Sequence, residues 1–198
     1  MPLPWRYSYN IFIMSLPGTK TTSDYIDFDR ATAVGFKLIK ENKKPVFGLY
    51  IIVSINTGLR ISDVLSLKWS DLEGDSIKLK EKKTGKFREI QINDSIKKAV
   101  SKFEHNSGYV FLSQKGSIYS RQQINKLLKQ VFAREAKSLN TSSHSLRKSF
   151  ARRVFSNNNE SEKSLIYLSE ILNHTSVKTT RIYLGLRQEQ INDIYLNL

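Results

Sequence analysis

The sequence contains no cysteine among its 198 residues, which excludes disulfides, thiolate metal sites and cysteine nucleophiles and fits a reducing cytosol. Histidine is also scarce: three residues are scattered along the chain, with no helical His-Glu pair or acidic cluster beside them. This pattern argues against a zinc site, and we expect no bound metal. A glycine-rich phosphate-binding loop is missing as well, so we expect no nucleotide cofactor.

Long apolar runs near the amino end are missing too. Residues 9–16 are apolar, but the stretch is short, has no charged leader beyond Arg6 and is followed by Pro17 and Gly18. It has the form of neither a signal peptide nor a membrane span. No amphipathic anchoring helix or lipidation motif stands out, and we therefore expect a cytoplasmic protein without a membrane partner.

Acidic residues are outnumbered, since 32 Lys and Arg against 18 Asp and Glu leave a formal charge of +14. A charge of this size usually has a polyanionic partner, and nucleic acid is favoured over a membrane here. A basic surface that only keeps the protein soluble is the alternative.

Length and composition indicate one folded domain. With 198 residues and 39% hydrophobic residues, the chain can build one substantial core but not two large domains. We assign this domain to residues 23–186 and interpret residues 1–22 as an extended leader or the remnant of a linker. Residues 187–198 form a tail in which helical spacing joins Ile191, Ile194, Tyr195 and Leu198.

The run at 45–56 is apolar on every side, which predicts a helix through the middle of the core. Thr57 and Gly58 end it, and Arg60 then begins a second helix. Asp63 lies three residues further on, where it can hold a partner on the same face. An ordinary surface pair between Asp63 and Arg60 is the alternative, although a surface pair would not usually follow the most buried helix.

Period-two alternation between residues 76 and 92 predicts a β-hairpin that turns near Gly85, with one face covered and one basic. Residues 108–113 could add a third short strand. The basic residues of this hairpin could lie along a nucleic-acid groove, or they could protect an edge strand from aggregation. They are Lys78, Lys80, Lys82, Lys83, Lys86 and Arg88.

The rest of the chain is predicted to be helical, which makes the fold mixed, mainly α with a small antiparallel β-hairpin. The predicted helices cover residues 122–137, 145–155, 163–172 and 176 to about 186. In the second of these, His144 and Arg147 project from one face and could contact the same small anion. A plain surface pair would show the same spacing.

Four stretches, taken in order, resemble the catalytic domain of the tyrosine recombinase (phage integrase) family: "TGLRISDVLSLKW", "KKTGK", "HSLRKSFA" and "LNHTSVKTTRIYL". The resemblance runs from about residue 24 to residue 186 and implies that family's catalytic-domain fold. It implies a catalytic set of Arg60, Lys83, His144, Arg147, His174 and Tyr183, with Asp63 in a supporting role. Lys82 or Lys86 could replace Lys83, because a hairpin tip is easily misaligned.

The resemblance implies a site-specific recombinase that cleaves DNA through a covalent 3′-phosphotyrosine intermediate, without metal or cofactor. Double-stranded DNA is then the partner, and hairpin residues Lys78, Lys80, Lys82, Lys86 and Arg88 would contact it. The family also implies a homotetramer on DNA, from a protein that can be monomeric when free, with accessory DNA-bending proteins as further partners. Its location is the cytoplasm, at the nucleoid when bound to DNA, and its tail would dock on a neighbouring protomer or fold back on its own core.

Three features depart from the family pattern. Asn173 stands where a glycine usually precedes the second histidine, and the stretch "SNNNESEKSLIY" is more polar than is typical. There is also no room for the amino-terminal core-binding domain that most members carry. The chain therefore looks like a short single-domain member or a fragment. Two other functions stay open: a type IB topoisomerase-like nicking and closing enzyme, and a DNA-binding regulator without catalysis.

Overall fold

The structure is a computed structural model that describes residues 23–104, 107–132, 139–186 and 194–197. The leader expected at 1–22 lies outside these residues, as does most of the tail. Of the four tail residues with helical spacing, Ile194 and Tyr195 are described, and they are 63% and 73% exposed. These two side chains therefore do not pack on the core.

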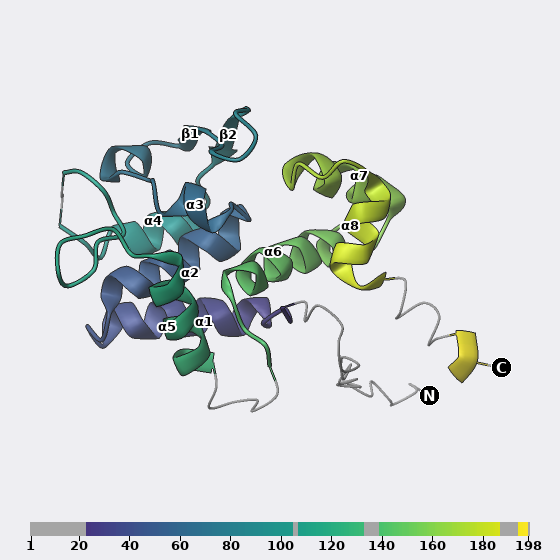
Figure 1. The fold of residues 1–198 in the computed structure, drawn as a ribbon, viewed down its shortest axis with the longest axis horizontal. Coiled ribbons are helices and arrows are strands. Elements are labelled where there is room, and N and C mark those ends of the chain that lie inside the picture. The colour runs from purple at the N-terminus through teal and green to yellow at the C-terminus, as the bar shows by residue number, and fades with distance from the viewer. Residues whose placement is uncertain (1–22, 105–106, 133–138, 187–193, 198) are drawn as a thin grey trace, which may run out of the picture.

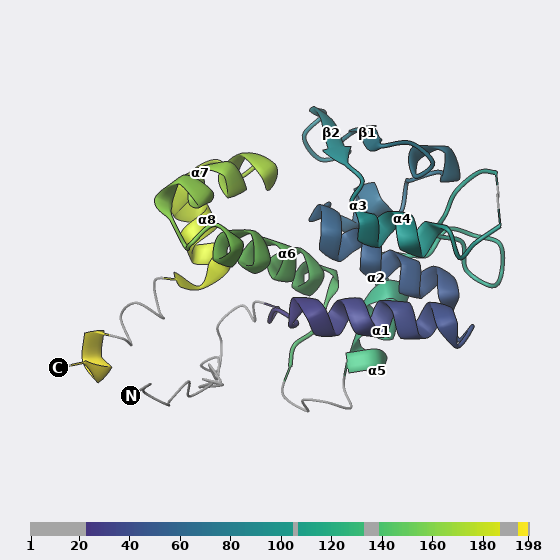
Figure 2. The same cartoon turned by 180° about the vertical axis from the view of Figure 1, so that it is seen from behind.

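A helical body surrounds one almost fully buried helix. Helix α2 (Pro45–Thr57) packs along α1 (Phe28–Lys40) and contacts α4 (Asp94–Val100) and α6 (Ser143–Asn157), as Figures 1 and 2 show from opposite sides. Nearly every residue of α2 is buried, which confirms the core helix predicted from its uniform hydrophobicity. Helix α5 (Arg121–Phe132) adds Ile124, Leu128 and Phe132 to the same core.

A second, smaller hydrophobic cluster lies toward the carboxyl end. It joins the second half of α6 to α7 (Glu162–Ile171) and α8 (Val177–Leu184) through side chains such as Phe155, Leu168 and Leu184. Helix α6 therefore connects the two clusters, and Figure 1 shows α7 opposite the hairpin, above α6. Among the described residues, none of the helices has the length and apolar character needed to span a membrane.

The predicted hairpin is present as β1 (Ser76–Lys80) and β2 (Phe87–Gln91), with Ile77 paired to Ile90 on the covered face. Gly85 lies in the turn with φ +69°. The other face is basic only in part, because Lys78 is opposite Glu89 and Lys80 is opposite Phe87.

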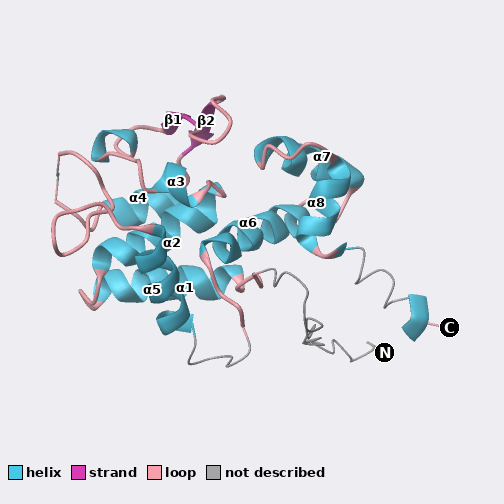
Figure 3. Ribbon diagram, viewed as in Figure 1, coloured by secondary structure: helices cyan, strands magenta, loops and turns pink. Residues whose placement is uncertain are grey.

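The prediction of a third strand at 108–113 is wrong. This segment makes isolated bridges from Tyr109 to Lys68 and from Leu112 to Ile118, and the sheet consists of β1 and β2 alone in the described part of the chain. Figure 3 draws these strands in magenta. The chain enters the segment at Gly108 with φ +81° and turns back again at Gly116 with φ +75°, so too little extended chain remains to pair with the hairpin.

The other predicted helices are confirmed within one or two residues, except that the helix after Arg60, α3 (Ile61–Val64), is a single turn before a short 3₁₀ helix, η1 (Trp69–Asp71). Residues 133–137 of the helix expected at 122–137 lie outside the described part of the chain. Helices α1 and α4 were not anticipated. Both carry an N-cap, Asp27 and Asn93, whose side chain accepts a backbone N–H bond, and this was the available signal.

Candidate active site

The turn after α2 brings two distant arginines together. Gly58 ends the helix with φ +62°, and a Cβ added there would lie 2.3 Å from Cδ1 of Phe150. Both the left-handed backbone and the close approach require glycine. The carbonyl of Gly58 accepts a short hydrogen bond from Nη1 of Arg147, and Arg60 follows two residues later as the N-cap of α3.

Arg60 is bound by a residue that the sequence did not single out. Its Nη1 lies 2.7 Å from Oε2 of Glu81, and its Nη2 donates to the carbonyl oxygen of Leu172 at 3.3 Å. The alternative of a surface pair with Asp63 is wrong, because Asp63 is 1% exposed and its Oδ1 accepts the backbone N–H of Lys82 at 3.0 Å. Asp63 therefore anchors the backbone where the hairpin turn begins, which is a supporting position.

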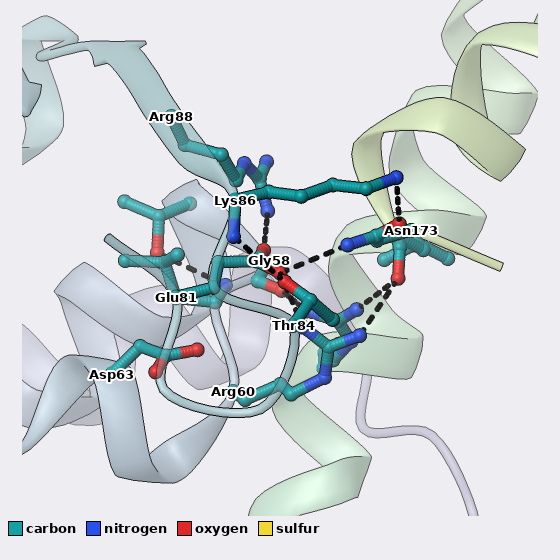
Figure 4. Close-up of polar contacts among 12 residues, drawn as sticks. Gly58, Arg60, Asp63, Glu81, Thr84, Lys86, Arg88 and Asn173 are labelled. Atoms are coloured by element: carbon teal, nitrogen blue, oxygen red, sulfur yellow. Dashed lines mark hydrogen bonds and ion pairs between the residues drawn. The ribbon is translucent and has the colours of Figure 1, made fainter. Parts of the chain in front are cut away.

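Glu81 lies at the centre of the network in Figure 4 and its side chain is fully buried. Oε1 accepts from Nη1 of Arg88 at 2.9 Å, while Oε2 also accepts from Oγ1 of Thr84 at 2.7 Å and Nδ2 of Asn173 at 3.1 Å. Burial raises the pKa of this carboxyl, but these hydrogen bonds together with that of Arg60 outweigh it and lower the pKa to about 2. The only sequence signal was an acidic residue inside the basic stretch "KLKEKKTGK".

Helix α6 supplies the His-x-x-Arg pair. Ser142 caps the helix, so that His144 lies in the first turn and Arg147 one turn further on. Arg147 is 5% exposed, and its Nη2 donates to the Leu172 oxygen at 2.7 Å. Burial lowers the pKa of this guanidinium to about 10, with the charges of Arg60 and Arg88 acting in the same direction, so it stays protonated at neutral pH.

Tyr183 and His174 come from consecutive elements and meet edge to face, with ring centroids 5.2 Å apart. His174 follows the end of α7, where Asn173 has φ +50°, and its Nδ1 is 3.0 Å from Oγ1 of Thr180. The Tyr183 hydroxyl is 3.5 Å from the carbonyl oxygen of His144. The short segment between the two residues therefore brings their side chains together.

The acid–base groups of the site are shifted toward their neutral forms. Burial raises the pKa of Tyr183 to about 12, although the charge of Arg147 opposes this. The pKa of His174 is lowered by burial and by the charges of Arg147 and Arg60. Partial burial and several nearby cations likewise lower the pKa of His144; those cations are Arg147, Arg121, Lys148 and Lys83. Both imidazoles are therefore neutral at pH 7.

The three hairpin lysines that could serve one catalytic position lie in different places. Lys83 is exposed, and its charge reaches His144. Lys82 lines a groove of about 290 Å³ with Tyr119 and Arg121, and Nζ of Lys86 lies 3.0 Å from Oδ1 of Asn173.

The remaining basic residues of the hairpin have partners within the chain. Lys78 lies 3.6 Å from Glu89, Lys80 lies over the ring of Phe87, and Arg88 is bound to Glu81. Lys78, Lys80, Lys82 and Lys86 are largely accessible, whereas the side chain of Arg88 is 17% exposed. Within the described ranges, no group of three or more acidic or histidine side chains gathers in the manner of a metal site.

Comparisons with known proteins identify the family. The phage integrase family matches residues 39–190. The integrase/recombinase YoeC of Bacillus subtilis, named as probable, is 30% identical over 166 residues, which cover 80% of this chain and 86% of YoeC. The tyrosine recombinase XerC of Xanthomonas campestris is 29% identical over 146 residues, or 71% of this chain and 44% of XerC.

The fold has the same relatives. A crystal structure of the XerH site-specific recombinase, bound to its difH substrate after cleavage, superposes with a TM-score of 0.64 at 22% identity and covers 96% of this chain and 58% of that one. The chain spans about half the length of the XerC relatives that it matches. The predicted family and fold are thus confirmed, and the chain belongs to the phage integrase family of tyrosine recombinases.

Proposed function

We propose that this protein is a site-specific DNA recombinase that cuts and rejoins DNA strands through a 3′-phosphotyrosine intermediate. The observation that carries the proposal is the convergence of Arg60, Arg147, His174 and Tyr183, from four separate elements, around the carbonyl end of α7. Relatives that are named recombinases, one of them solved with its DNA substrate, support it.

The two arginines suit the task of binding one phosphate. A guanidinium has five N–H donors, and Arg60 uses two of them toward Glu81 and Leu172. Arg147 uses two toward Gly58 and Leu172 and also hydrogen-bonds Tyr183. Both arginines therefore keep donors for the non-bridging oxygens of a phosphodiester. Such bonds strengthen as charge builds up in the pentacoordinate transition state.

In the proposed cleavage step the hydroxyl oxygen of Tyr183 forms a bond to phosphorus, and the bond from phosphorus to the 5′ oxygen breaks. The phenol proton passes to a neutral histidine, for which His144 is the candidate, while His174 hydrogen-bonds the phosphate. Lys83 supplies the proton that the leaving 5′ oxygen needs. The phosphotyrosine conserves the energy of the diester, so that a 5′ hydroxyl can reverse the step without ATP or metal.

Double-stranded DNA is the proposed partner, and hairpin residues are its proposed contacts. They are the accessible lysines Lys78, Lys80, Lys82 and Lys86, together with the less exposed Arg88, which is bound to Glu81. A homotetramer on DNA, accessory bending proteins and a cytoplasmic place of action are parts of the same proposal. Residues 23–186 would be the catalytic unit, with 1–22 as an extended leader or the remnant of a linker and 187–198 as a tail that docks on a neighbouring protomer.

Covalent capture tests the function directly. The protein is mixed with fragmented DNA of its source, denatured with detergent, and the DNA that stays attached is sequenced, with Tyr183→Phe alongside. Adducts at a few repeated sites that vanish in Tyr183→Phe are expected. Adducts spread without preference would instead favour nicking and closing, and no adduct from the unmodified protein would contradict the proposal and favour a DNA-binding regulator.

A further inference from the structure

We infer that Glu81 is a positioning residue for strand cleavage, which holds the guanidinium of Arg60 in the orientation needed to bind the scissile phosphate. This inference rests on the function proposed above. It concerns a residue that touches neither DNA nor the reacting atoms, and that the tyrosine recombinase motifs do not include.

Two acceptors fix the Arg60 guanidinium. Oε2 of Glu81 accepts from Nη1 at 2.7 Å, and the Leu172 oxygen accepts from Nη2 at 3.3 Å. The Glu81 contact is the shorter one and is charge-assisted, so it should contribute most to the orientation. Without it, the 3.3 Å bond to a neutral carbonyl would remain, and the side chain could rotate about its long stem.

Glu81 is itself held rigidly. Its buried carboxylate accepts from Thr84 in the same turn, from Arg88 on β2 and from Asn173 after α7 (Figure 4). A carboxylate removed from water needs such a set of donors, and a group with this many partners has little freedom to move. The hairpin turn and the end of α7 therefore set the position of Arg60 through one side chain.

The charge balance of the cluster fits a phosphate partner. Glu81 neutralises part of the positive charge of Arg60 and Arg88, and its field also reaches Arg147. One carboxylate among three guanidinium groups lets the arginines gather without a bound anion, yet it leaves an excess of positive charge for the DNA.

Asn173 helps to hold Glu81 in place. Its φ of +50° would suit glycine, which the family usually has at this position, but glycine could not supply the Nδ2 donor to Glu81. The departure from the family pattern therefore accompanies the buried glutamate. Asn173→Gly removes this donor while keeping a residue that tolerates the backbone conformation.

The test compares Glu81→Gln with Glu89→Gln, which removes an exposed carboxylate from the same hairpin. Single-turnover cleavage is measured on a synthetic duplex of a site recovered by covalent capture, with either an ordinary or a methylphosphonate group at the scissile position. A methylphosphonate lacks the negative charge that Arg60 is proposed to meet.

Glu81→Gln should slow cleavage of the phosphate duplex by about 10- to 100-fold, the scale of a small misplacement of a catalytic group, and of the methylphosphonate duplex by about threefold or less. Glu89→Gln should leave both rates within about twofold. In an Arg60→Ala background, Glu81→Gln should cause almost no further loss, since coupled residues are not additive. If Glu81→Gln unfolds, the milder variant Asn173→Gly replaces it in the test. Asn173→Gly should also slow cleavage of the phosphate duplex more than cleavage of the methylphosphonate duplex.

Four outcomes would overturn the inference. Equal losses on the two duplexes, or additive losses with Arg60→Ala, would mean that Glu81 acts on folding alone, which thermal unfolding of each variant would reveal. Undiminished cleavage by a folded Glu81→Gln would exclude the role altogether. If the unmodified protein forms no adduct that depends on Tyr183, the proposed function fails, and this inference fails with it.

Discussion

Arg60 and Arg147 donate to the same backbone oxygen, that of Leu172, at 3.3 and 2.7 Å. Leu172 is the C-cap of α7, and the carbonyl end of a helix carries partial negative charge. This end therefore stabilises two cations that would otherwise repel each other, and it holds the tips of both guanidinium groups close together. The same short segment continues into Asn173 and His174.

Loss of Arg147 should affect cleavage and stability together. Arg147→Ala is expected to slow Tyr183-dependent cleavage by about 100-fold or more, the scale of losing one oxyanion donor. It should also destabilise the fold by about 1–3 kcal/mol, because the carbonyls of Gly58 and Leu172 lose a buried donor. Single-turnover rates and urea unfolding measure the two effects.

Arg153→Ala is the matched control for Arg147→Ala, because Arg153 lies on the same helix but pairs with Asp29 of α1. Its cleavage rate should stay within about threefold of the unmodified protein. An unchanged rate in Arg147→Ala would remove this arginine from the active site.

A side chain at Gly58 should destabilise the protein strongly. Gly58→Ala combines a left-handed backbone, at φ +62°, with a Cβ 2.3 Å from the ring of Phe150, and we expect a loss of about 2–4 kcal/mol. Gly116→Ala is the control, since Gly116 has φ +75° but nothing within 4 Å of the added Cβ. It should lose only about 1–2 kcal/mol in urea unfolding. Equal losses of stability in the two variants would show that Phe150 moves away from the added Cβ without destabilising the fold.

The cleavage rate should resist mild acid. A lowered histidine pKa means that protonation requires a lower pH than usual. If His144 accepts the phenol proton, it should therefore remain neutral and able to do so until the pH falls to the ordinary histidine pKa. Single-turnover rates should therefore be level from about pH 8 to about pH 6.5 and fall below that. His144→Gln should be slow and lack this fall. A decline centred above about pH 7 would contradict the assignment of a lowered pKa.

Changing the leaving group can show which hairpin lysine supplies the proton to the 5′ oxygen. A substrate in which sulfur replaces the leaving 5′ oxygen needs little help from an acid, because a thiolate is a far better leaving group. Lys83→Ala should slow cleavage of the ordinary substrate by about 100-fold or more. The same variant should cleave the sulfur substrate at nearly the unmodified rate. Lys86→Ala should show a small effect on both, since Lys86 binds Asn173. The reverse pattern would assign the proton to Lys86.

Removal of the tail should weaken assembly more than chemistry. Deletion of residues 187–198 is expected to reduce formation of multimeric DNA complexes in gel-shift assays while single-strand cleavage by each protomer persists, because Ile194 and Tyr195 do not pack on the core. Equal loss of both activities would argue against docking on a neighbour.

The sequence by itself determined the core helix, the hairpin and the order of the catalytic motifs. Each rests on local information: a run apolar on every side at 45–56, period-two alternation at 76–92, and short stretches in which residues three positions apart share a helix or residues nine positions apart lie on consecutive elements. It also located the turn at Gly58, because glycine is needed where the backbone becomes left-handed. The prediction of a strand at 108–113 was wrong because local composition does not reveal whether another strand lies beside the segment to pair with it.

Only the tertiary structure decided what surrounds the catalytic groups. Glu81 meets Arg60 across 21 positions and Asn173 across 92, and Arg147 meets Gly58 across 89. No periodicity connects residues so far apart. Burial then selects the partners, because a charge removed from water must find an opposite charge or several donors close by. For that reason Glu81, one acidic residue in a basic hairpin, proved to be the buried carboxylate that binds both Arg60 and Arg88.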